Sequence, residues 1–114
     1  MSEPYAEKLE RLVEAVLETP GDLDSDVRRA VEARAAELGG RAAAEVAEVP
    51  AELAAYVEKV AMHAYKTTDA DIERLKAAGY SEDAIFEVTV ATALGAARVR
   101  LERGLAALEE AGER

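Results

Sequence analysis

Apolar residues recur every three or four positions along most of this chain of 114 residues, and this spacing is typical of α-helices. The helical stretches are separated by short breaks that contain proline, glycine, threonine or aspartate. We therefore predict a single all-α domain spanning residues 1–114. It is expected to be a bundle of about five to six helices with a long C-terminal helix.

A front pair of helices is expected between residues 4 and 39, packed antiparallel. Pro4 is compatible with the first turn of the first helix, which Pro20-Gly21 ends. Asp22 or Asp24 is expected to cap the second helix, and the glycine pair at 39–40 stops it. The inner faces are predicted to hold Leu9, Leu12, Val13, Val16 and Leu17 in the first helix and Val27, Ala30, Val31, Arg34, Ala35 and Leu38 in the second.

Two further helices are expected in residues 50–79, after a connector over residues 40–49 that lacks a clean period. Pro50 opens the third helix, which runs to about Tyr65. Thr68, with Asp71 three residues later, is typical of a capping box for the fourth helix, which closes at Gly79. Beside the apolar stripe of the third helix, four polar residues return to nearly the same azimuth: Glu52, Tyr56, Lys59 and His63.

The last helix is expected to run from residue 82 to about residue 110, with Ser81 as its cap. It has apolar residues on more than one face, so it must be covered on several sides. Gly95 and Gly104 lie inside it, and each costs on the order of 1 kcal/mol in helix propensity relative to alanine. Close approach by another helix would explain both glycines.

The composition predicts a thin core. Apolar residues make up 50% of the chain, but many are alanine, and aromatic residues are only 4%. Alanine favours helices and buries little surface, so copies of the chain are expected to share apolar surface as a homo-oligomer.

Charge and hydropathy argue against several classes of partner. The formal net charge of −10 would repel a nucleic-acid backbone or an anionic membrane face. No apolar run is long enough to cross a bilayer, and the first residues do not resemble a signal peptide. We therefore expect a cytoplasmic protein without nucleic-acid or membrane partners.

The chain contains no cysteine and one histidine. Thiol chemistry, disulfides and thiolate metal sites are therefore excluded. With one histidine and no spaced carboxylate loop, no metal site is expected, and no cofactor is predicted.

A helix, a break, a helix ending in AAG and then the run YSEDAIFEVTVATALGAARVRLERGLAAL succeed one another between Glu52 and Leu108. This order resembles the alkylhydroperoxidase D-like (AhpD-like), or carboxymuconolactone decarboxylase-like, family. The resemblance covers about half of the chain and takes residues 50–110 as the family-like region. It implies an AhpD-like helical bundle that assembles into trimers or hexamers.

Redox members of that family carry a glutamate, a Cys-x-x-Cys pair and a histidine. By the resemblance, Glu52 falls at the glutamate position, Ala64 and Thr67 at the two cysteines, and Asp71 at the histidine. Lys66 lies between the cysteine positions, where some members carry a second histidine. Peroxidase activity through a cysteine relay is excluded, because this chain has no cysteine.

The candidate catalytic residues are Glu52 and His63. A glutamate can act as a general base, and histidine is the side chain that titrates nearest neutral pH. The candidate ligand-binding residues are Tyr56, Lys66, Thr67 and Asp71. The simpler interpretation is structural: a carboxylate favoured at a helix N-terminus, a histidine packed at an interface, a core tyrosine and a capping aspartate.

These alternatives predict two different functions. The first is a family member without redox cysteines that binds a small molecule, or a cofactor-free lyase or isomerase acting on a carboxylated or lactone-like substrate. In it, Lys66 would hold a carboxylate and His63 would protonate a carbanion. The second is a non-catalytic structural or interaction protein. An enclosed polar pocket touching Glu52 and His63 would favour the first, and solvated side chains there would favour the second.

Overall fold

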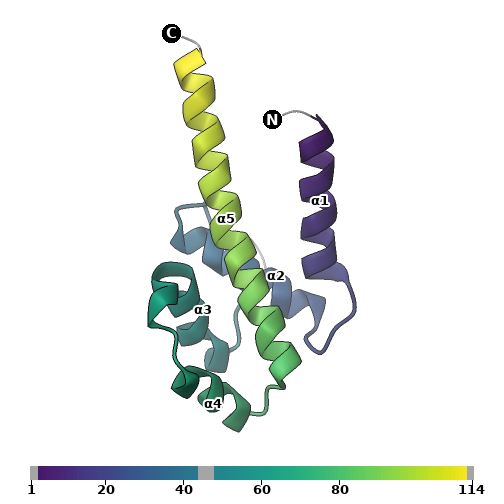
Figure 1. Cartoon of the computed structure of the whole chain (residues 1–114), viewed down its shortest axis with the longest axis vertical. Coiled ribbons are helices and arrows are strands. Elements are labelled where there is room, and N and C mark those ends of the chain that lie inside the picture. The colour runs from purple at the N-terminus through teal and green to yellow at the C-terminus, as the bar shows by residue number, and fades with distance from the viewer. Residues whose placement is uncertain (1–2, 44–47, 113–114) are drawn as a thin grey trace.

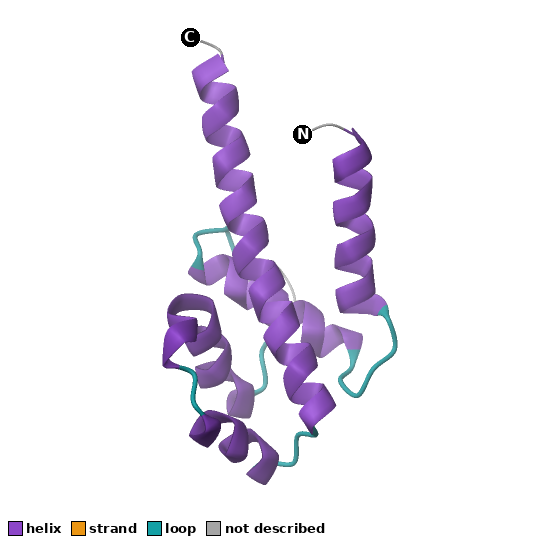
Figure 2. Ribbon diagram, viewed as in Figure 1, coloured by secondary structure: helices purple, strands orange, loops and turns teal. Residues whose placement is uncertain are grey.

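The computed structural model describes residues 3–43 and 48–112. These residues form five α-helices and one short 3-10 turn, and they contain no strand (Figure 2). The prediction of an all-helical fold with a long C-terminal helix is therefore confirmed. The elements are α1 (Glu3–Glu18), α2 (Ser25–Leu38), α3 (Ala51–His63), the 3-10 turn η1 (Ala64–Lys66), α4 (Asp69–Ala77) and α5 (Glu82–Gly112).

Local sequence signals set most helix ends. Asp24 precedes α2, and its backbone oxygen accepts hydrogen bonds from two first-turn amides at 3.1 Å. Gly40 comes after the end of α2 with φ of 110°, a backbone conformation that glycine adopts without strain. Ser81 caps α5, because its hydroxyl accepts a hydrogen bond from the Ala84 amide at 3.0 Å. Part of the expected connector, residues 44–47, lies outside the described residues.

The core is built around the first half of α5. Helix α2 crosses behind α5 in Figure 1, while α3 and α4 lie beside its lower part. Leu53, Val57 and Val88 are fully buried where α3 meets α5. At Gly95, a β-carbon would meet the Glu32 carbonyl oxygen of α2. The close approach expected at this glycine is therefore present, and the approaching helix is α2.

The predicted antiparallel front pair is not the main packing of the N-terminal helices. Helix α2 packs chiefly against α5, whereas α1 makes only limited contacts with α2 and α5. Because α2 is covered along a broad front, Arg28 and Glu32 are buried with its alanines, and Arg34, predicted on the inner face, is exposed. On α1, Leu17 is buried, but Leu12 remains 53% exposed.

The second half of α5 extends beyond the core. The last buried residue of α5 is Val99, and we call residues 100–112 the α5 arm. The molecule consequently measures 54 × 28 × 25 Å, and both described chain ends lie at the same end of its long axis (Figure 1).

Candidate functional site

Glu52 and His63, the two predicted catalytic residues, lie at opposite ends of α3. They are eleven positions apart, which corresponds to about 16 Å along the helix axis. Both side chains are exposed. The His63 ring makes an edge contact with the Tyr65 ring, with 6.2 Å between the ring centroids. Near the other end of α3, burial and the negative charge of Glu52 raise the pKa of Tyr80. One small substrate therefore cannot contact Glu52 and His63 together within a single copy.

Tyr56 lies between these two residues and is buried. Its phenol and the Thr89 hydroxyl of α5 are 2.7 Å apart and share a hydrogen bond. The Thr89 hydroxyl also donates to the Ile85 carbonyl oxygen at 2.7 Å, so the Tyr56 hydroxyl donates to Thr89. Tyr56 thus joins α3 to α5, as expected of a core tyrosine.

Asp71 is also buried. Its carboxylate accepts hydrogen bonds from the Lys59 ammonium at 2.8 Å and from the Thr68 amide at 2.8 Å. These two donors, Lys59 first, lower the pKa of Asp71 to about 2. The predicted capping box between Thr68 and Asp71 is confirmed. Asp71 therefore stays ionised and ties α4 to α3.

Lys66 ends the 3-10 turn η1 that follows α3, and Thr67 comes next. Lys66 is exposed, and its ammonium lies 5.8 Å from the centroid of the Tyr65 ring. The Thr67 hydroxyl oxygen is buried and has no hydrogen-bond partner among the described residues. The structure thus places Lys66 beside Tyr65, whereas the buried Tyr56 and Asp71 belong to separate helix contacts.

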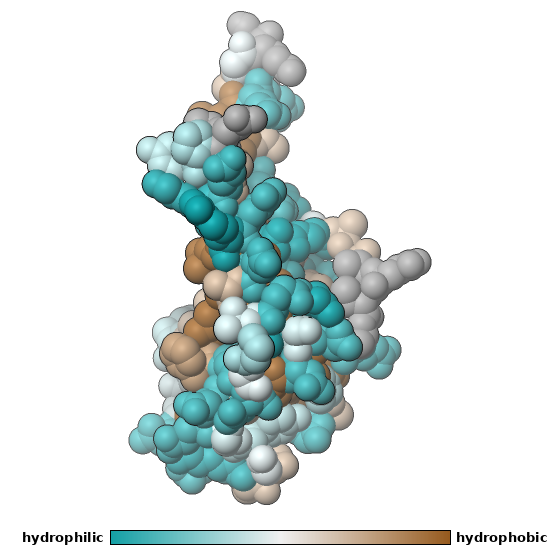
Figure 3. All heavy atoms as spheres, turned by 90° about the vertical axis from the view of Figure 1, so that its right-hand side faces the viewer, coloured by the Kyte–Doolittle hydropathy of each residue, from teal (hydrophilic) through white to brown (hydrophobic). Residues whose placement is uncertain are grey.

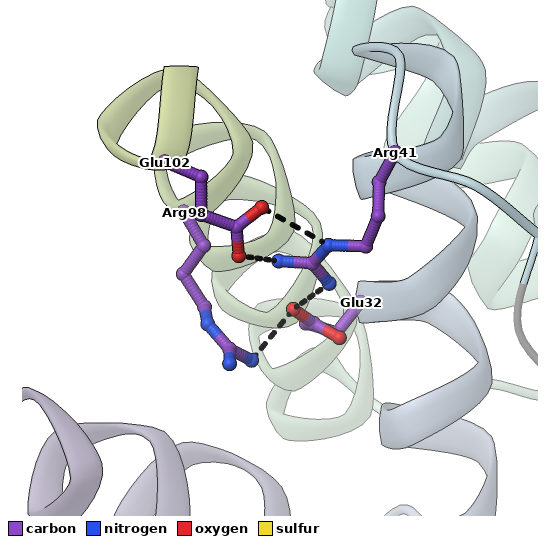
Figure 4. A network of polar contacts seen from close by, with 4 residues as sticks. All are labelled: Glu32, Arg41, Arg98 and Glu102. Carbon is purple, nitrogen blue, oxygen red and sulfur yellow. Dashed lines mark hydrogen bonds and ion pairs between the residues drawn. The ribbon is translucent and has the colours of Figure 1, made fainter. Parts of the chain in front are cut away.

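A four-residue network, which the sequence did not single out, joins α2 to α5 (Figure 4). Glu32 of α2 accepts a hydrogen bond from Arg98 Nη1 of α5 at 2.9 Å and another from Arg41 Nη1 at 3.3 Å. Arg41 also donates to Glu102 of α5, through Nη2 at 2.6 Å and Nε at 3.4 Å.

This network is suited to holding helices together rather than to proton transfer. The Glu32 side chain is only 7% exposed, so its charge needs the two guanidinium groups. Hydrogen bonding to Glu102 raises the pKa of Arg41 further above its usual value. The sequence signal for this network was Glu32, a charged residue that lies on α2 among alanines.

A groove of about 420 Å³ lies between α1 and α5. Its apolar lining comes from α1, and Arg98 contributes from α5. In the space-filling view of Figure 3, hydrophobic atoms gather along the left edge of the molecule, below its narrow upper part. The lining residues are Ala6, Leu9, Glu10, Val13, Glu14, Leu17, Glu18 and Arg98.

Two further properties concern the described residues as a whole. Their histidine, aspartate and glutamate side chains form no cluster that could hold a metal ion. None of their helices is long and apolar enough to cross a membrane.

Comparisons with family models, curated proteins and solved structures found no match to this chain.

Proposed function

We propose that this protein is a non-catalytic, homo-oligomeric interaction protein whose copies associate through α1 and the α5 arm. The exposed apolar surface of these two segments carries the proposal. Tyr5 and Leu12 of α1 are 64% and 53% exposed, and Leu101 and Leu108 of the arm are 39% and 69% exposed. Covering one such large side chain stabilises an assembly by roughly 1.5–3 kcal/mol, before the cost of association.

The leucines of the arm lie along one stripe of the helix. Leu94, Leu101 and Leu108 recur every seven residues, and Ala97 and Gly104 recur at the same interval three positions later. A seven-residue repeat of this kind is the pattern with which one helix packs along another. Leu94 is buried within the core, so the stripe continues from the core onto the exposed arm.

Gly104 supports the same surface. Apart from its chain neighbours and the adjoining backbone of α5, no atom of the described residues lies within 4 Å of the position where its β-carbon would be, so a single copy does not explain a glycine there. At Gly95, the other glycine in the interior of α5, a neighbouring helix fills that space. A helix from a second copy that packs as closely at Gly104 would account for both glycines.

Opposite charges are available for a contact between unlike segments. Glu7, Glu10 and Glu14 of α1 are exposed, with Arg11 beside them. The arm carries the exposed residues Arg100 and Arg103 together with the acidic Glu102, Glu109 and Glu110. Arg100 and Arg103 of one copy can therefore pair with the α1 glutamates of the next. A contact between two different surfaces is head-to-tail and can close into a ring. Trimers or hexamers are also what the family resemblance implies.

The alternative is small-molecule binding or acid/base chemistry at Glu52 and His63, as a lyase or isomerase without redox cysteines. It has less support, because both side chains are exposed and lie at opposite ends of α3. This proposal would need a second copy to complete the site.

Light scattering after gel filtration tests the proposed assembly. Wild-type protein at about 100 μM is expected to have the mass of a trimer or hexamer. Changing Leu101 and Leu108 to glutamate places charges on the stripe and is expected to give monomers. Met62→Glu is the matched control, since Met62 is 48% exposed on α3, away from this surface. A monomeric wild-type protein, or a double variant that keeps its full mass, would contradict the proposal.

A further inference from the structure

A second groove, of about 340 Å³, lies where the end of α1 and the start of α5 meet the buried Arg28 of α2. The groove shares the last turn of α1 with the proposed contact surface but does not involve the α5 arm. Its walls are largely apolar, and its lining consists of Ala15, Val16, Thr19, Pro20, Gly21, Arg28, Phe86, Glu87 and Val90.

Arg28 is the unusual member of this lining, because it is only 4% exposed and forms no ion pair with a described carboxylate. Its Nη1 donates to the Val16 carbonyl oxygen at 2.9 Å. That carbonyl would otherwise bond the amide four residues later, but residue 20 is a proline and has no N–H. Arg28 thus supplies the hydrogen bond missing at the end of α1.

One hydrogen bond to a carbonyl oxygen leaves the charge of the guanidinium without a paired anion among the described residues. Arginine has five N–H donors, and Arg28 Nε is buried without a partner among the described residues. A buried, permanently charged group normally has a paired anion, because removing it from water costs several kcal/mol. The nearest candidate on the groove wall, Glu87, instead accepts hydrogen bonds from the Asp22 and Leu23 amides at 3.0 and 3.1 Å.

We propose that this groove binds a small monocarboxylate with an apolar body, whose carboxylate pairs with Arg28. Planar guanidinium groups match carboxylates in shape and hydrogen bonding. Val16, Phe86 and Val90 line the space that the apolar body occupies. The carboxylate of Glu87 and the net charge of −10 disfavour ligands of higher negative charge, such as phosphate esters.

Amide chemical shifts of isotope-labelled protein, titrated with phenylacetate, test the site. The uncharged analogue 2-phenylethanol, of similar size, is the matched probe. Phenylacetate is expected to give saturable shifts at Val16, Thr19, Gly21, Phe86 and Val90, and to bind at least tenfold more tightly than the alcohol. Equal affinity for both probes, absence of saturation, or shifts confined to other residues would overturn the proposal.

Two variants test separately the contributions of the Arg28 charge and of the apolar groove wall to binding. Arg28→Met is expected to weaken phenylacetate binding at least tenfold and to leave binding of the alcohol unchanged. Because this change also removes the hydrogen bond at the end of α1, Phe86→Ala serves as a second variant at an exposed wall residue. It is expected to weaken binding of both probes about threefold or more, while Met62→Ala changes neither. A Phe86→Ala protein that changes its oligomeric mass but binds phenylacetate normally would show that a second copy covers the groove, and would overturn the proposal.

Discussion

Arg98 and Glu32 are 66 positions apart in the chain, yet Arg98 Nη1 donates a hydrogen bond to Glu32 Oε1 at 2.9 Å. The pair lies where α5 leaves the core, and Arg41 joins it from the end of α2. The contact therefore fixes α2 against α5 at the base of the α5 arm.

Glu32→Gln is expected to lower the free energy of unfolding by about 2–3 kcal/mol, since it leaves two guanidinium groups without their shared charge. Urea unfolding followed by circular dichroism measures this loss. Glu102→Gln is the matched control, because the Glu102 side chain is 52% exposed, and its loss is expected to cost less than about 1 kcal/mol. Equal effects of the two substitutions would contradict a stabilising role for the buried carboxylate.

Asp71 is expected to make stability depend on pH in the acid range. Its pKa is about 2 in the folded protein, against an ordinary value of 3.8. A lowered pKa stabilises the folded state; the contribution is complete above pH 3.8 and is lost as pH falls toward 2. Thermal melts between those pH values should therefore show a smaller fall in Tm for Asp71→Asn than for wild type. Asp69→Asn, on the exposed first residue of α4, should keep the wild-type slope.

Gly95→Ala is expected to destabilise the fold by about 1–3 kcal/mol, because the new methyl group would push α2 away from α5. The β-carbon would meet the Glu32 carbonyl oxygen and the Ala35 side chain, which belong to a packed helix. Denaturant unfolding gives the magnitude. A gain in stability, as helix propensity alone predicts for glycine to alanine, would show that the two helices separate at little cost.

Glu52→Gln and His63→Ala are each expected to change the free energy of unfolding by less than about 0.5 kcal/mol, because both side chains are exposed. Tyr56→Phe, on the same helix, should cost about 0.5–1.5 kcal/mol, because Thr89 loses its partner.

Thermal melts with and without small carboxylates and lactones also test the catalytic alternative. A ligand-induced rise in Tm that Glu52→Gln and His63→Ala both abolish would support a site at these residues and count against a purely structural role.

Most of the fold was predictable, because its determinants are local. The apolar period, Pro20, Gly40, the Thr68–Asp71 box and Ser81 identify the helices and most of their ends. These signals depend on backbone geometry within one turn, so no tertiary information is needed. The candidate site was less predictable, because sharing an azimuth on α3 did not bring Glu52 and His63 into reach of one ligand.

The chain alone determined that the protein is helical, acidic and without thiol chemistry, because composition and local periodicity decide these properties. Only the tertiary structure decided that α2 packs on α5 rather than along α1, and that Arg34 is exposed while Arg28 and Glu32 are buried. Helix faces of similar polarity can pack in several ways. The choice among them comes from the summed contacts of residues far apart in the chain, such as Gly95 with Glu32.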